Sequence, residues 1–567
     1  MALDIEKLVS IIGPKPKFNL DFYHGEDLYS DGDVEDEIIE MIAKNAPDEY
    51  NDAIYANYKW ATFYHLTQMR QNILNWYPFE EGSNVLEIGC GFGAITGLLC
   101  DKCESVTSVE LSKRRATGAL LRCREKDNLE IIVGNLNEIK FENKFDYITL
   151  IGVLEYQGSY TDGENPYQEF LKKVKSLLKP NGKLLIAIEN QYGIKYWCGA
   201  VEDHTTVPFD GINGYVMTDR KVRTFSRKGL EKLVKDSGFA YTYFYYPMPD
   251  YKLPTVIYSE KHLPSSANME NVNYYYIPST KYLIGNEAKI SEDIIENGVF
   301  EFFANSFLVE CSDDDAIGEM KFTCASSLRL KDYQMLTSMT KDGKVVKRSC
   351  IKRNAGRHLD EIMQNEHNLK ERGIAVCEGE RMGDTLVYPF LEGNSLEKQY
   401  LKAYEEKNVQ KMYEILDTVW NCILMSSDEV APEENIMYAL GIGDVKNSTY
   451  YGPILKNAYI DMLLRNSIIN NGQLTWIDQE WVLENAPAKF AFFRMITELY
   501  IPYPHLENVL PFAQIFEKYG LMECFEDFQE LNKLFFDVVI DRKMCGERGG
   551  LPGIDESVIK QNIINLI

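Results

Sequence analysis

The sequence predicts an α/β protein in two parts, a parallel sheet with crossover helices followed by a separate α+β unit. Between residues 84 and 190, short β-rich runs such as NVLEIG, SVTSVE and KLLIAIEN alternate with helical stretches, which is typical of a parallel sheet. Beyond about residue 298, strand-like runs come first and helices follow. The length of 567 residues also exceeds what one hydrophobic core usually supports, so at least two domains are expected.

We expect five segments along the chain. Residues 1–80 hold an acidic stretch and an aromatic-rich segment that predict an N-terminal helical cap. Residues 81–260 form the first α/β domain, which is closed by the helical run SRKGLEKLVKDSGF and two strand-like runs. Residues 261–297 are polar and irregular, as in a linker. Residues 298–495 form the α+β domain, and residues 496–567 form a helical C-terminal region.

Charge and hydropathy exclude two classes of partner. Lys and Arg total 60 against 86 Asp and Glu, a formal charge of -26, which disfavours nucleic-acid binding driven by counterion release. No apolar run reaches the ~18 residues needed to span a bilayer. The first residues also lack a basic segment followed by a long apolar one. We therefore expect a cytoplasmic protein without a membrane span.

The motif VLEIGCGFG places glycines between a strand and the helical run AITGLLC. Gly89, Gly91 and Gly93 allow a tight turn and close approach of a ligand, and the helix start offers unpaired N–H groups. The next strand ends in Glu110, 19 residues after Gly91, where an acidic residue can bind both ribose hydroxyls of a nucleoside. The motif therefore predicts a nucleoside-cofactor site.

The motif is consistent with two cofactors, a dinucleotide or S-adenosylmethionine, because GCGFGA also satisfies the dinucleotide fingerprint G-x-G-x-x-A. Glu87 on the last turn of the strand separates them, since a carboxylate suits the cationic sulfonium and amino group of S-adenosylmethionine. Residues 84–260 resemble class I S-adenosylmethionine-dependent methyltransferases, whose first motif is E/D-x-G-x-G-x-G. The resemblance implies a Rossmann-like fold, with Glu110 at the ribose and Asn135 and Leu136 of GNLNEI beside the adenine.

Candidates for a general base lie in loops after the fourth and fifth strands. Methyl transfer needs the acceptor in line with the sulfonium, and the need for a base depends on the acceptor's pKa. Glu155 and Tyr156 follow FDYITLIGVL, and His204 follows two acidic residues that could orient it as a base. The loop from Glu189 to His204 mixes aromatic residues with carboxylates, which suits a carbohydrate. A solvated His204 on a surface loop is the alternative.

A second set of polar residues has the spacing of a kinase catalytic loop. Asp461 and Asn466 stand five residues apart, and an Asn-Gly hairpin signal then brings Asp478 back beside them. Upstream, MTKDGKVVK predicts a hairpin whose second strand ends at Lys347, the place of a phosphate-binding lysine. Glu366 interrupts the apolar face of the following helix. We expect it to pair with Lys347, because an unpaired buried charge is costly.

These features, with the strand and hinge LVYPFLEGNSLEK, resemble aminoglycoside phosphotransferase-like and other small-molecule kinases. The resemblance implies ATP and Mg²⁺ as ligands, Asp461 as the base, and Asn466 and Asp478 as metal ligands. Three features depart from the pattern: no glycine-rich loop precedes Lys347, Tyr459 replaces the catalytic-loop His, and IDQEW replaces D-F-G. A catalytically inactive, kinase-like binding module is therefore the alternative.

The combination of a methyltransferase and a kinase-like domain resembles bacterial kinase/methyltransferases that terminate O-antigen chains, where a terminal sugar is phosphorylated and the phosphate methylated. ENQYGIKYWCGAVEDHT and IDQEWVLENAPAKFAFFR also look like segments of methyltransferases associated with bacterial glycosyltransferases. The resemblance implies an enzyme that methylates a sugar or sugar phosphate in surface-glycan biosynthesis, with a glycan acceptor and glycosyltransferases as partners. Methylation of a protein or a small metabolite is the alternative.

Overall fold

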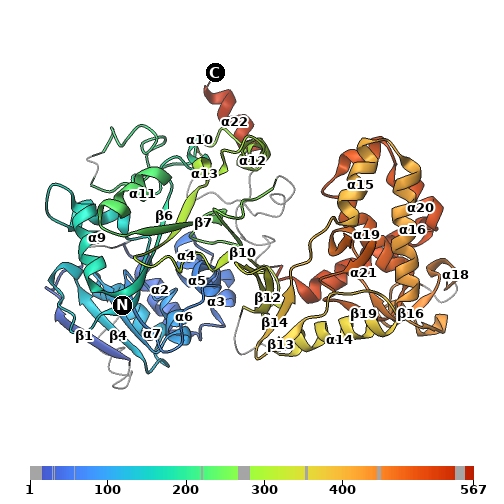
Figure 1. Cartoon of the computed structure of the whole chain (residues 1–567), viewed down its shortest axis with the longest axis horizontal. Helices are drawn as coiled ribbons and strands as arrows, with labels where there is room; N and C mark the ends of the chain where they lie inside the picture. The colour runs from blue at the N-terminus through green and yellow to red at the C-terminus, as the bar shows by residue number, and fades with distance from the viewer. Residues whose placement is uncertain are drawn as a thin grey trace. The chain divides into compact units, whose positions relative to one another are not determined.

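The chain divides into two compact units in a computed structural model (Figure 1). The first unit comprises Met1–Ser327 together with Lys543–Ile567, and the second comprises Leu328–Arg542. The structure describes residues 16–27, 30, 32–56, 58–218, 221–265, 281–350, 356–443, 448–542 and 556–566. Within these residues, no helix is both long enough and apolar enough to cross a membrane.

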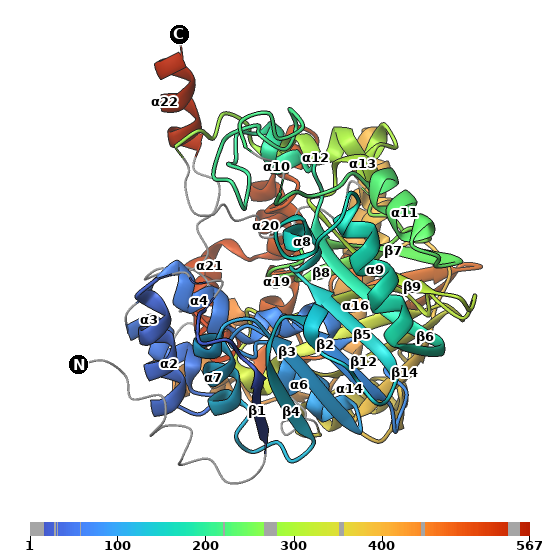
Figure 2. The same cartoon turned by 90° about the vertical axis from the view of Figure 1, so that its left-hand side faces the viewer.

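Strands of the first unit lie side by side in one sheet, with parallel pairing from β1 to β6 and antiparallel pairing beyond (Figure 2). The order is β1 (Lys17–Phe22), β4 (Leu129–Gly134), β3 (Ser105–Glu110), β2 (Asn84–Ile88), β5 (Phe145–Ile151), β6 (Leu178–Glu189), β9 (Ser306–Ser312), β7 (Tyr241–Met248), β8 (Val256–Ser259) and β10 (Met320–Ala325). Because β2 pairs with both β3 and β5, the direction of strand addition reverses at β2. Ligands of open α/β sheets bind beyond the carboxyl ends of strands at such a point.

Helices cover this sheet and bury its apolar residues. They are α2 (Val34–Lys44), α3 (Tyr50–Ala56), α4 (Trp60–Leu66), α5 (Asn72–Asn75), α6 (Thr96–Lys102), α7 (Lys113–Arg122), α8 (Gln157–Tyr160), α9 (Pro166–Leu177), α10 (Ile194–Trp197), α11 (Arg227–Asp236), α12 (Glu287–Glu296) and α13 (Phe300–Phe303). A further helix of this unit, α22 (Glu556–Leu566), has no buried residue. α6 and α7 contact β3 and β4, while α9 and α11 contact β6 and β7. The strands are nearly continuous apolar runs, as expected for a parallel sheet covered on both faces.

The observed division differs from the predicted segments at four places. β9 pairs with β6 and β10 pairs with β8, so residues up to Ser327 extend the first sheet and the second unit does not begin at residue 298. The predicted linker contains α12, although residues 266–280 lie outside the described residues. The predicted helical cap contains β1, which pairs with β4, and α22 belongs to the first unit.

The second unit has an antiparallel sheet followed by a larger, mainly helical part. Strands β11 (Met335–Thr340), β12 (Lys344–Ser349), β14 (Thr385–Pro389) and β13 (Glu380–Met382) pair in that order. The helices are α14 (Arg357–Glu371), α15 (Leu396–Glu405), α16 (Val409–Met425), α17 (Ile436–Ala439), α18 (Ser448–Tyr451), α19 (Ala488–Tyr500), α20 (Phe512–Tyr519) and α21 (Phe525–Val539). β15 (Glu429–Val430), β16 (Ile454–Tyr459) and β19 (Val482–Pro487) form a small sheet, and β17 (Ser467–Asn470) and β18 (Gln473–Trp476) form a ribbon.

Both predicted hairpins of this unit are present. β11 and β12 pair around Asp342 and Gly343, and β17 and β18 pair around Asn471 and Gly472. Asn471 and Gly472 have φ of 50° and 80°, the left-handed conformation that two-residue hairpin turns require. The second hairpin carries the chain to Asp478, as the Asn-Gly signal predicted.

Candidate functional site

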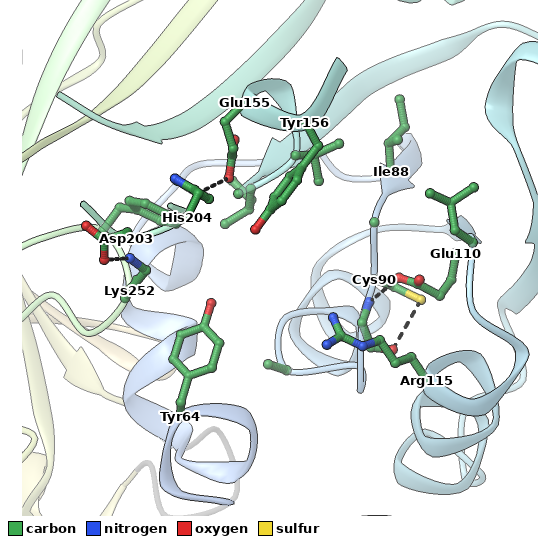
Figure 3. A pocket seen from close by; sticks show the side chains of 18 of the residues that line it. Tyr64, Ile88, Cys90, Glu110, Arg115, Glu155, Tyr156, Asp203, His204 and Lys252 are labelled. Carbon is green, nitrogen blue, oxygen red and sulfur yellow. Dashed lines mark hydrogen bonds and ion pairs between the residues drawn. The ribbon is translucent and has the colours of Figure 1, made fainter. Parts of the chain in front are cut away.

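A cavity of about 450 Å³ lies in the first unit beyond the carboxyl ends of its parallel strands. Its lining includes residues of the loops after β2, β3, β4 and β5, at 89–92, 110–111, 134–136 and 152–157. Further lining residues come from α4 and from the segments 195–204 and 250–252. Figure 3 shows Glu110 and Arg115 at one end of the cavity and Glu155, His204 and Lys252 at the other. The cavity therefore has two ends of different chemistry.

The glycine loop after β2 needs glycine at each motif position. Gly89, Gly91 and Gly93 have φ of 78°, 53° and 73°, which residues with a side chain rarely adopt. A Cβ at Gly89 would lie 2.5 Å from Cγ2 of Val153, and one at Gly93 would lie 3.0 Å from Cα of Ala119. Gly89 and Gly91 line the cavity, whereas Gly93 packs against α7. The prediction that these glycines form a close-packed turn at a ligand site agrees with this geometry.

Glu110 closes the loop from the neighbouring strand end. Its Oε2 accepts a hydrogen bond from the Gly91 N–H at 2.8 Å, and its Oε1 accepts one from the Ser112 N–H at 3.0 Å. Burial raises the pKa of the Glu110 carboxyl, while these N–H groups and Arg115 oppose the rise. Each carboxylate oxygen has a further lone pair, so Glu110 can accept hydrogen bonds from two ligand hydroxyls.

Glu87 lies at the end of β2, as predicted, and hydroxyl groups of two neighbouring elements hold its carboxylate. It lies outside the lining that the described residues give this cavity, and its Oε2 accepts hydrogen bonds from the hydroxyls of Thr96 and Ser108, both at 2.7 Å. Burial raises the pKa of Glu87 to about 7, against the effect of these two hydroxyls. Glu87 thus ties β2 to α6 and β3, and its predicted contact with a bound sulfonium stays a prediction.

Asn135 and Leu136 line the cavity at the end of β4, as expected for residues beside an adenine. The Asn135 side chain accepts a hydrogen bond from the Asn137 N–H at 2.9 Å and so caps the short turn that begins at Leu136. Leu136 is 4% exposed and belongs to the apolar core beneath the sheet edge. The pair thus offers an apolar surface next to a polar one.

Carboxylates surround His204 at the other end of the cavity. Its Nε2 lies 3.5 Å from Oε1 of Glu155 (Figure 3). The same atom lies 3.8 Å from Oε2 of Glu189, and Nδ1 lies 3.2 Å from Oε1 of Glu202. Burial opposes the charge on His204, but these carboxylates outweigh it and raise the pKa of His204 well above its usual range. His204 lies buried among these carboxylates at the cavity wall, and its predicted role as a base stays a prediction.

The other two predicted catalytic residues fit the cavity. Burial raises the pKa of Glu155, as does neighbouring Glu189, while His204 opposes the rise. The Tyr156 ring meets the edge of the His204 ring at a centroid distance of 5.2 Å. Glu155 and Tyr156 belong to the 3₁₀ turn Leu154–Tyr156 that follows β5, and both line the cavity.

Two lysines of this end were not predicted. Lys252 binds Oε1 of Glu189 at 2.5 Å and also binds Asp203, and Lys195 binds Oδ2 of Asp203 at 2.8 Å. Lys252 follows β7, more than 40 residues beyond His204 in the chain, and no local pattern connects it to the loop that holds Asp203. Only the order of strands in the sheet brings these segments together.

The second predicted site gathers four of its five residues. Lys347 binds Asp478, and it also lies 3.1 Å from Oε1 of Glu480. Asn466 donates a hydrogen bond from Nδ2 to the backbone carbonyl of Asp461 at 3.1 Å. Lys347, Asp461, Asn466 and Asp478 therefore come from separate elements of the second unit to one cluster.

Glu366 does not form the expected ion pair with Lys347 within the described residues of this unit. It accepts hydrogen bonds from the Tyr388 hydroxyl at 2.8 Å and from the Gly379 N–H at 2.9 Å. The prediction was wrong because Glu480, which the spacing argument left out, supplies the buried carboxylate for Lys347. Tyr388 and the Gly379 backbone then satisfy Glu366.

Asp461 is also used differently from the prediction. Its Oδ2 accepts hydrogen bonds from the N–H groups of Glu480 and Trp481 at 3.0 and 2.8 Å, and the residue is 6% exposed. Burial raises its pKa to about 7. The carboxylate therefore holds the chain after β18 in place and is not exposed as a proton acceptor.

Residues 60–243 match the profile of a protein family described as "Methyltransferase domain". This segment is a class I S-adenosylmethionine-dependent methyltransferase domain. It contains the glycine loop, Glu110, Asn135, and the Glu155 and His204 end of the cavity. The donor set fits the cofactor, because paired carboxylate oxygens face the cavity at Glu110 and an apolar surface lies at Leu136.

Two curated methyltransferases are similar to a short stretch of this chain. A malonyl-[acyl-carrier protein] O-methyltransferase of Priestia megaterium is 32% identical over 111 residues, which is 19% of this chain and 38% of the relative. N-methyltransferase 4 of Papaver somniferum is 26% identical over 115 residues, 19% of this chain and 30% of the relative. The chain thus spans under two fifths of the length of these two curated relatives, and they support the methyltransferase domain alone.

Solved structures of methyltransferases resemble this chain weakly. An S-adenosylmethionine-dependent methyltransferase from Thermotoga maritima has 15% identity and a TM-score of 0.27, and the alignment covers 49% of this chain and 100% of that one. The N-methyltransferase NodS from Bradyrhizobium japonicum, in complex with S-adenosylhomocysteine, has 20% identity and a TM-score of 0.21 over 26% of this chain and 75% of that one. These TM-scores are too low to extend the domain assignment further.

Proposed function

We propose that the methyltransferase domain methylates a sugar or sugar phosphate in bacterial surface-glycan biosynthesis. The observation that carries this proposal is the composition of the cavity beyond the cofactor end. There, Tyr64, Tyr156 and Tyr251 lie with the carboxylates of Glu155 and Glu189. Aromatic rings pack against the apolar faces of a sugar ring, and carboxylates accept hydrogen bonds from its hydroxyl groups.

S-adenosylmethionine, when bound, supplies an electrophilic methyl group on its sulfonium. Glu110 holds the two ribose hydroxyls with the lone pairs left by Gly91 and Ser112. Asn135 and Leu136 hold the adenine. The glycine loop lets the backbone approach the cofactor closely, and Glu87 keeps that loop in place from below.

Glu155 is the residue best placed to take the proton of the acceptor hydroxyl. Its Oε2 is buried and accepts no hydrogen bond from the described residues, while Oε1 faces His204 at 3.5 Å. Burial raises the Glu155 pKa above its usual range, which makes the carboxylate a stronger base. The proton passes from the hydroxyl to Glu155 as the acceptor oxygen takes the methyl group.

The charge around this end of the cavity favours a neutral hydroxyl over a phosphate as the methylated group. Glu155, Glu189, Glu202, Asp203 and Asp250 give five negative charges when ionised. Lys195, Lys252 and His204 give three positive ones, so the formal balance of these eight groups is −2. A phosphate would be repelled unless a further cation neutralised it.

The test is transfer of a labelled methyl group from S-adenosylmethionine to a panel of oligosaccharides, sugar phosphates, peptides and small amines. We expect label in a saccharide and a 10²- to 10³-fold lower kcat for Glu155→Gln, since a positioned base contributes about that factor. Cofactor affinity should stay unchanged in this variant. Label found only in a polypeptide or a small amine would overturn the glycan acceptor.

We also propose that the second unit is kinase-like and binds Mg·ATP. The convergence of Lys347, Asn466 and Asp478 supports this, because a buried lysine suits phosphates and carboxylate and amide oxygens suit Mg²⁺. The Asp478 side chain is 45% exposed and so accessible to a metal. Asp461 does not fit as the base, which favours a binding module over an active kinase.

Calorimetric titration of Mg·ATP into the wild type and Asp478→Ala tests this second proposal. We expect binding by the wild type, loss of binding in the variant, and unchanged S-adenosylmethionine binding in both. If neither protein binds Mg·ATP, the nucleotide site is refuted and the inactive module remains.

For the whole chain we further propose a cytoplasmic location and glycosyltransferases as partners. Co-purification would test the partners.

A further inference from the structure

Three ligand atoms that suit a metal ion converge at the acceptor end of the methyltransferase cavity. Glu155 lies on the turn after β5, Glu189 ends β6, and His204 lies on the loop that follows α10. One ligand atom of each side chain lies within 4.8 Å of those of the other two. Figure 3 shows Glu155 and His204 pointing toward each other at the cavity wall. All three residues line the cavity, so an ion bound to them would face the acceptor.

The carboxylates in this group are buried and incompletely satisfied. Glu155 is 1% exposed and Glu189 is 0% exposed. Oε2 of each accepts no hydrogen bond from the described residues. Buried polar atoms normally have a partner, and an unpartnered buried carboxylate oxygen is especially costly. Two such atoms beside one cavity indicate a ligand that completes the site.

Lysine and histidine side chains among the described residues do not complete the site. Lys252 divides its ammonium group between Oε1 of Glu189 and Asp203, and Lys195 binds Asp203 and Asp250. His204 is shared among three carboxylates at 3.2 to 3.8 Å. With His204 neutral, as a metal ligand must be, the five carboxylates and two lysines have a formal balance of −3, so a divalent cation reduces the negative charge at this end of the cavity.

We propose that Glu155, Glu189 and His204 bind a divalent cation of the Mn²⁺ class, which holds two oxygens of the acceptor in its open positions. Two carboxylates and one imidazole suit Mn²⁺ better than Ca²⁺ or Zn²⁺, which prefer more oxygen or more nitrogen and sulfur ligands. Opposite ligands of an octahedral ion with bonds of about 2.1 Å lie about 4.2 Å apart. The three ligand atoms lie within 4.8 Å of one another, so only small movements of the side chains are needed to bind such an ion.

Such an ion would explain how a negatively charged cavity selects a saccharide. Neighbouring sugar hydroxyls can occupy two positions of one cation, which fixes the ring and lowers the pKa of the bound hydroxyl. The hydroxyl proton goes to the Glu155 oxygen that does not bind the ion. The oxygen–methyl bond forms as the sulfonium carbon–sulfur bond breaks, which leaves S-adenosylhomocysteine. The identity of the acceptor oxygens rests on the proposed function, whereas the metal site does not.

Titration of Mn²⁺ followed by electron paramagnetic resonance tests the site in the full chain, with S-adenosylmethionine present. Glu189→Gln and His204→Ala should each weaken Mn²⁺ binding at least 10-fold. Glu310→Gln is the matched control, because Glu310 is also a buried carboxylate, 1% exposed, but pairs with Lys183 away from this cavity. Asp478→Asn separates any Mn²⁺ site of the second unit from this one.

The outcomes are distinct. Loss of Mn²⁺ binding in Glu189→Gln and His204→Ala, with retention in Glu310→Gln and Asp478→Asn, supports the site, provided that all variants keep S-adenosylmethionine affinity. Glu155→Gln gives a second test if one of the others fails to fold. Wild-type protein that binds no Mn²⁺, or equal binding in all variants, would overturn it. If the protein binds Mn²⁺ at this site but methylates no saccharide, only the proposed function is refuted. If it methylates a saccharide in the presence of a chelator and binds no Mn²⁺, only the metal site is refuted.

Discussion

Glu87 and Glu110 end neighbouring strands and are both buried, yet their surroundings give them different roles. Thr96 and Ser108 hydroxyls donate to Glu87 beneath the loop, whereas Glu110 receives backbone N–H groups at the cavity wall. The sequence pattern assigned both carboxylates to the cofactor. The difference arises from the direction of each side chain relative to the loop, which neither motif nor spacing specifies.

Replacing Glu87 by glutamine should reduce the pH dependence of stability. Burial raises the folded-state pKa of Glu87 from 4.5 to about 7. The folded protein therefore holds a proton that the unfolded chain releases between these values, and the free energy of unfolding falls as pH rises through this window. The loss by pH 8 is at most about 3 kcal/mol, because one pKa unit corresponds to about 1.4 kcal/mol.

A glutamine side chain keeps an acceptor oxygen for both hydroxyls but carries no charge, so Glu87→Gln should be more stable than the wild type at pH 8 and similar at pH 5. Urea unfolding at several pH values measures this difference.

The affinity of Glu87→Gln for S-adenosylmethionine should stay within about threefold of the wild type. Glu110→Gln should lose about 10-fold or more of that affinity, as expected for a lost charged hydrogen-bond acceptor. Equal losses in both variants would place Glu87 at the cofactor after all.

The glycine loop is the element whose geometry the sequence predicted most closely. Its position after a strand and before a helix required a tight turn, and the φ values of Gly89 and Gly91 confirm it. By contrast, the acceptor end is built from segments far apart in the chain, with Lys252 reaching Glu189 and Asp203. A local pattern can specify a loop between adjacent elements, but it cannot specify which distant carboxylate a lysine will meet.

Gly89→Ala should therefore reduce the stability of the glycine loop more than Gly91→Ala does. Both residues have positive φ, which costs an alanine about 1–2 kcal/mol. Only at Gly89 would the new Cβ also meet Val153, at 2.5 Å, and such overpacking costs about 1–3 kcal/mol more. Thermal unfolding and S-adenosylmethionine titration should show the larger loss for Gly89→Ala.

Combining Gly89→Ala with Val153→Ala tests the cause of that loss. Removing the Val153 methyl groups should restore part of the stability of Gly89→Ala, although Val153→Ala alone should be neutral or destabilising. A double variant that is no better than additive would exclude the steric contact and leave backbone strain as the whole effect.

At the scale of the whole molecule, the chain carries two units with separate cores. The sequence predicted two domains from length and from the change of pattern, but it placed the boundary near residue 298. β9 and β10 instead belong to the first sheet, where they pair with β6 and β8. The N–H and C=O groups of an edge strand can pair with any strand that lies beside it. Strand-rich sequence looks alike whichever sheet it joins, so only pairing partners could have placed the boundary.

Lys347→Met should unfold the second unit more easily without affecting the first. Among the described residues, the substitution leaves buried Glu480 with Arg329 at 2.6 Å and His358 at 3.9 Å, and removing one partner of a buried ion pair costs about 3–5 kcal/mol. In calorimetry, S-adenosylmethionine should raise the transition temperature of the first unit in both proteins, because a ligand stabilises only the unit that binds it. The cofactor-insensitive transition should fall in Lys347→Met. An equal fall in the temperature of the cofactor-sensitive transition would show instead that the two units unfold cooperatively. The second unit would then influence methyl transfer through the stability of the first.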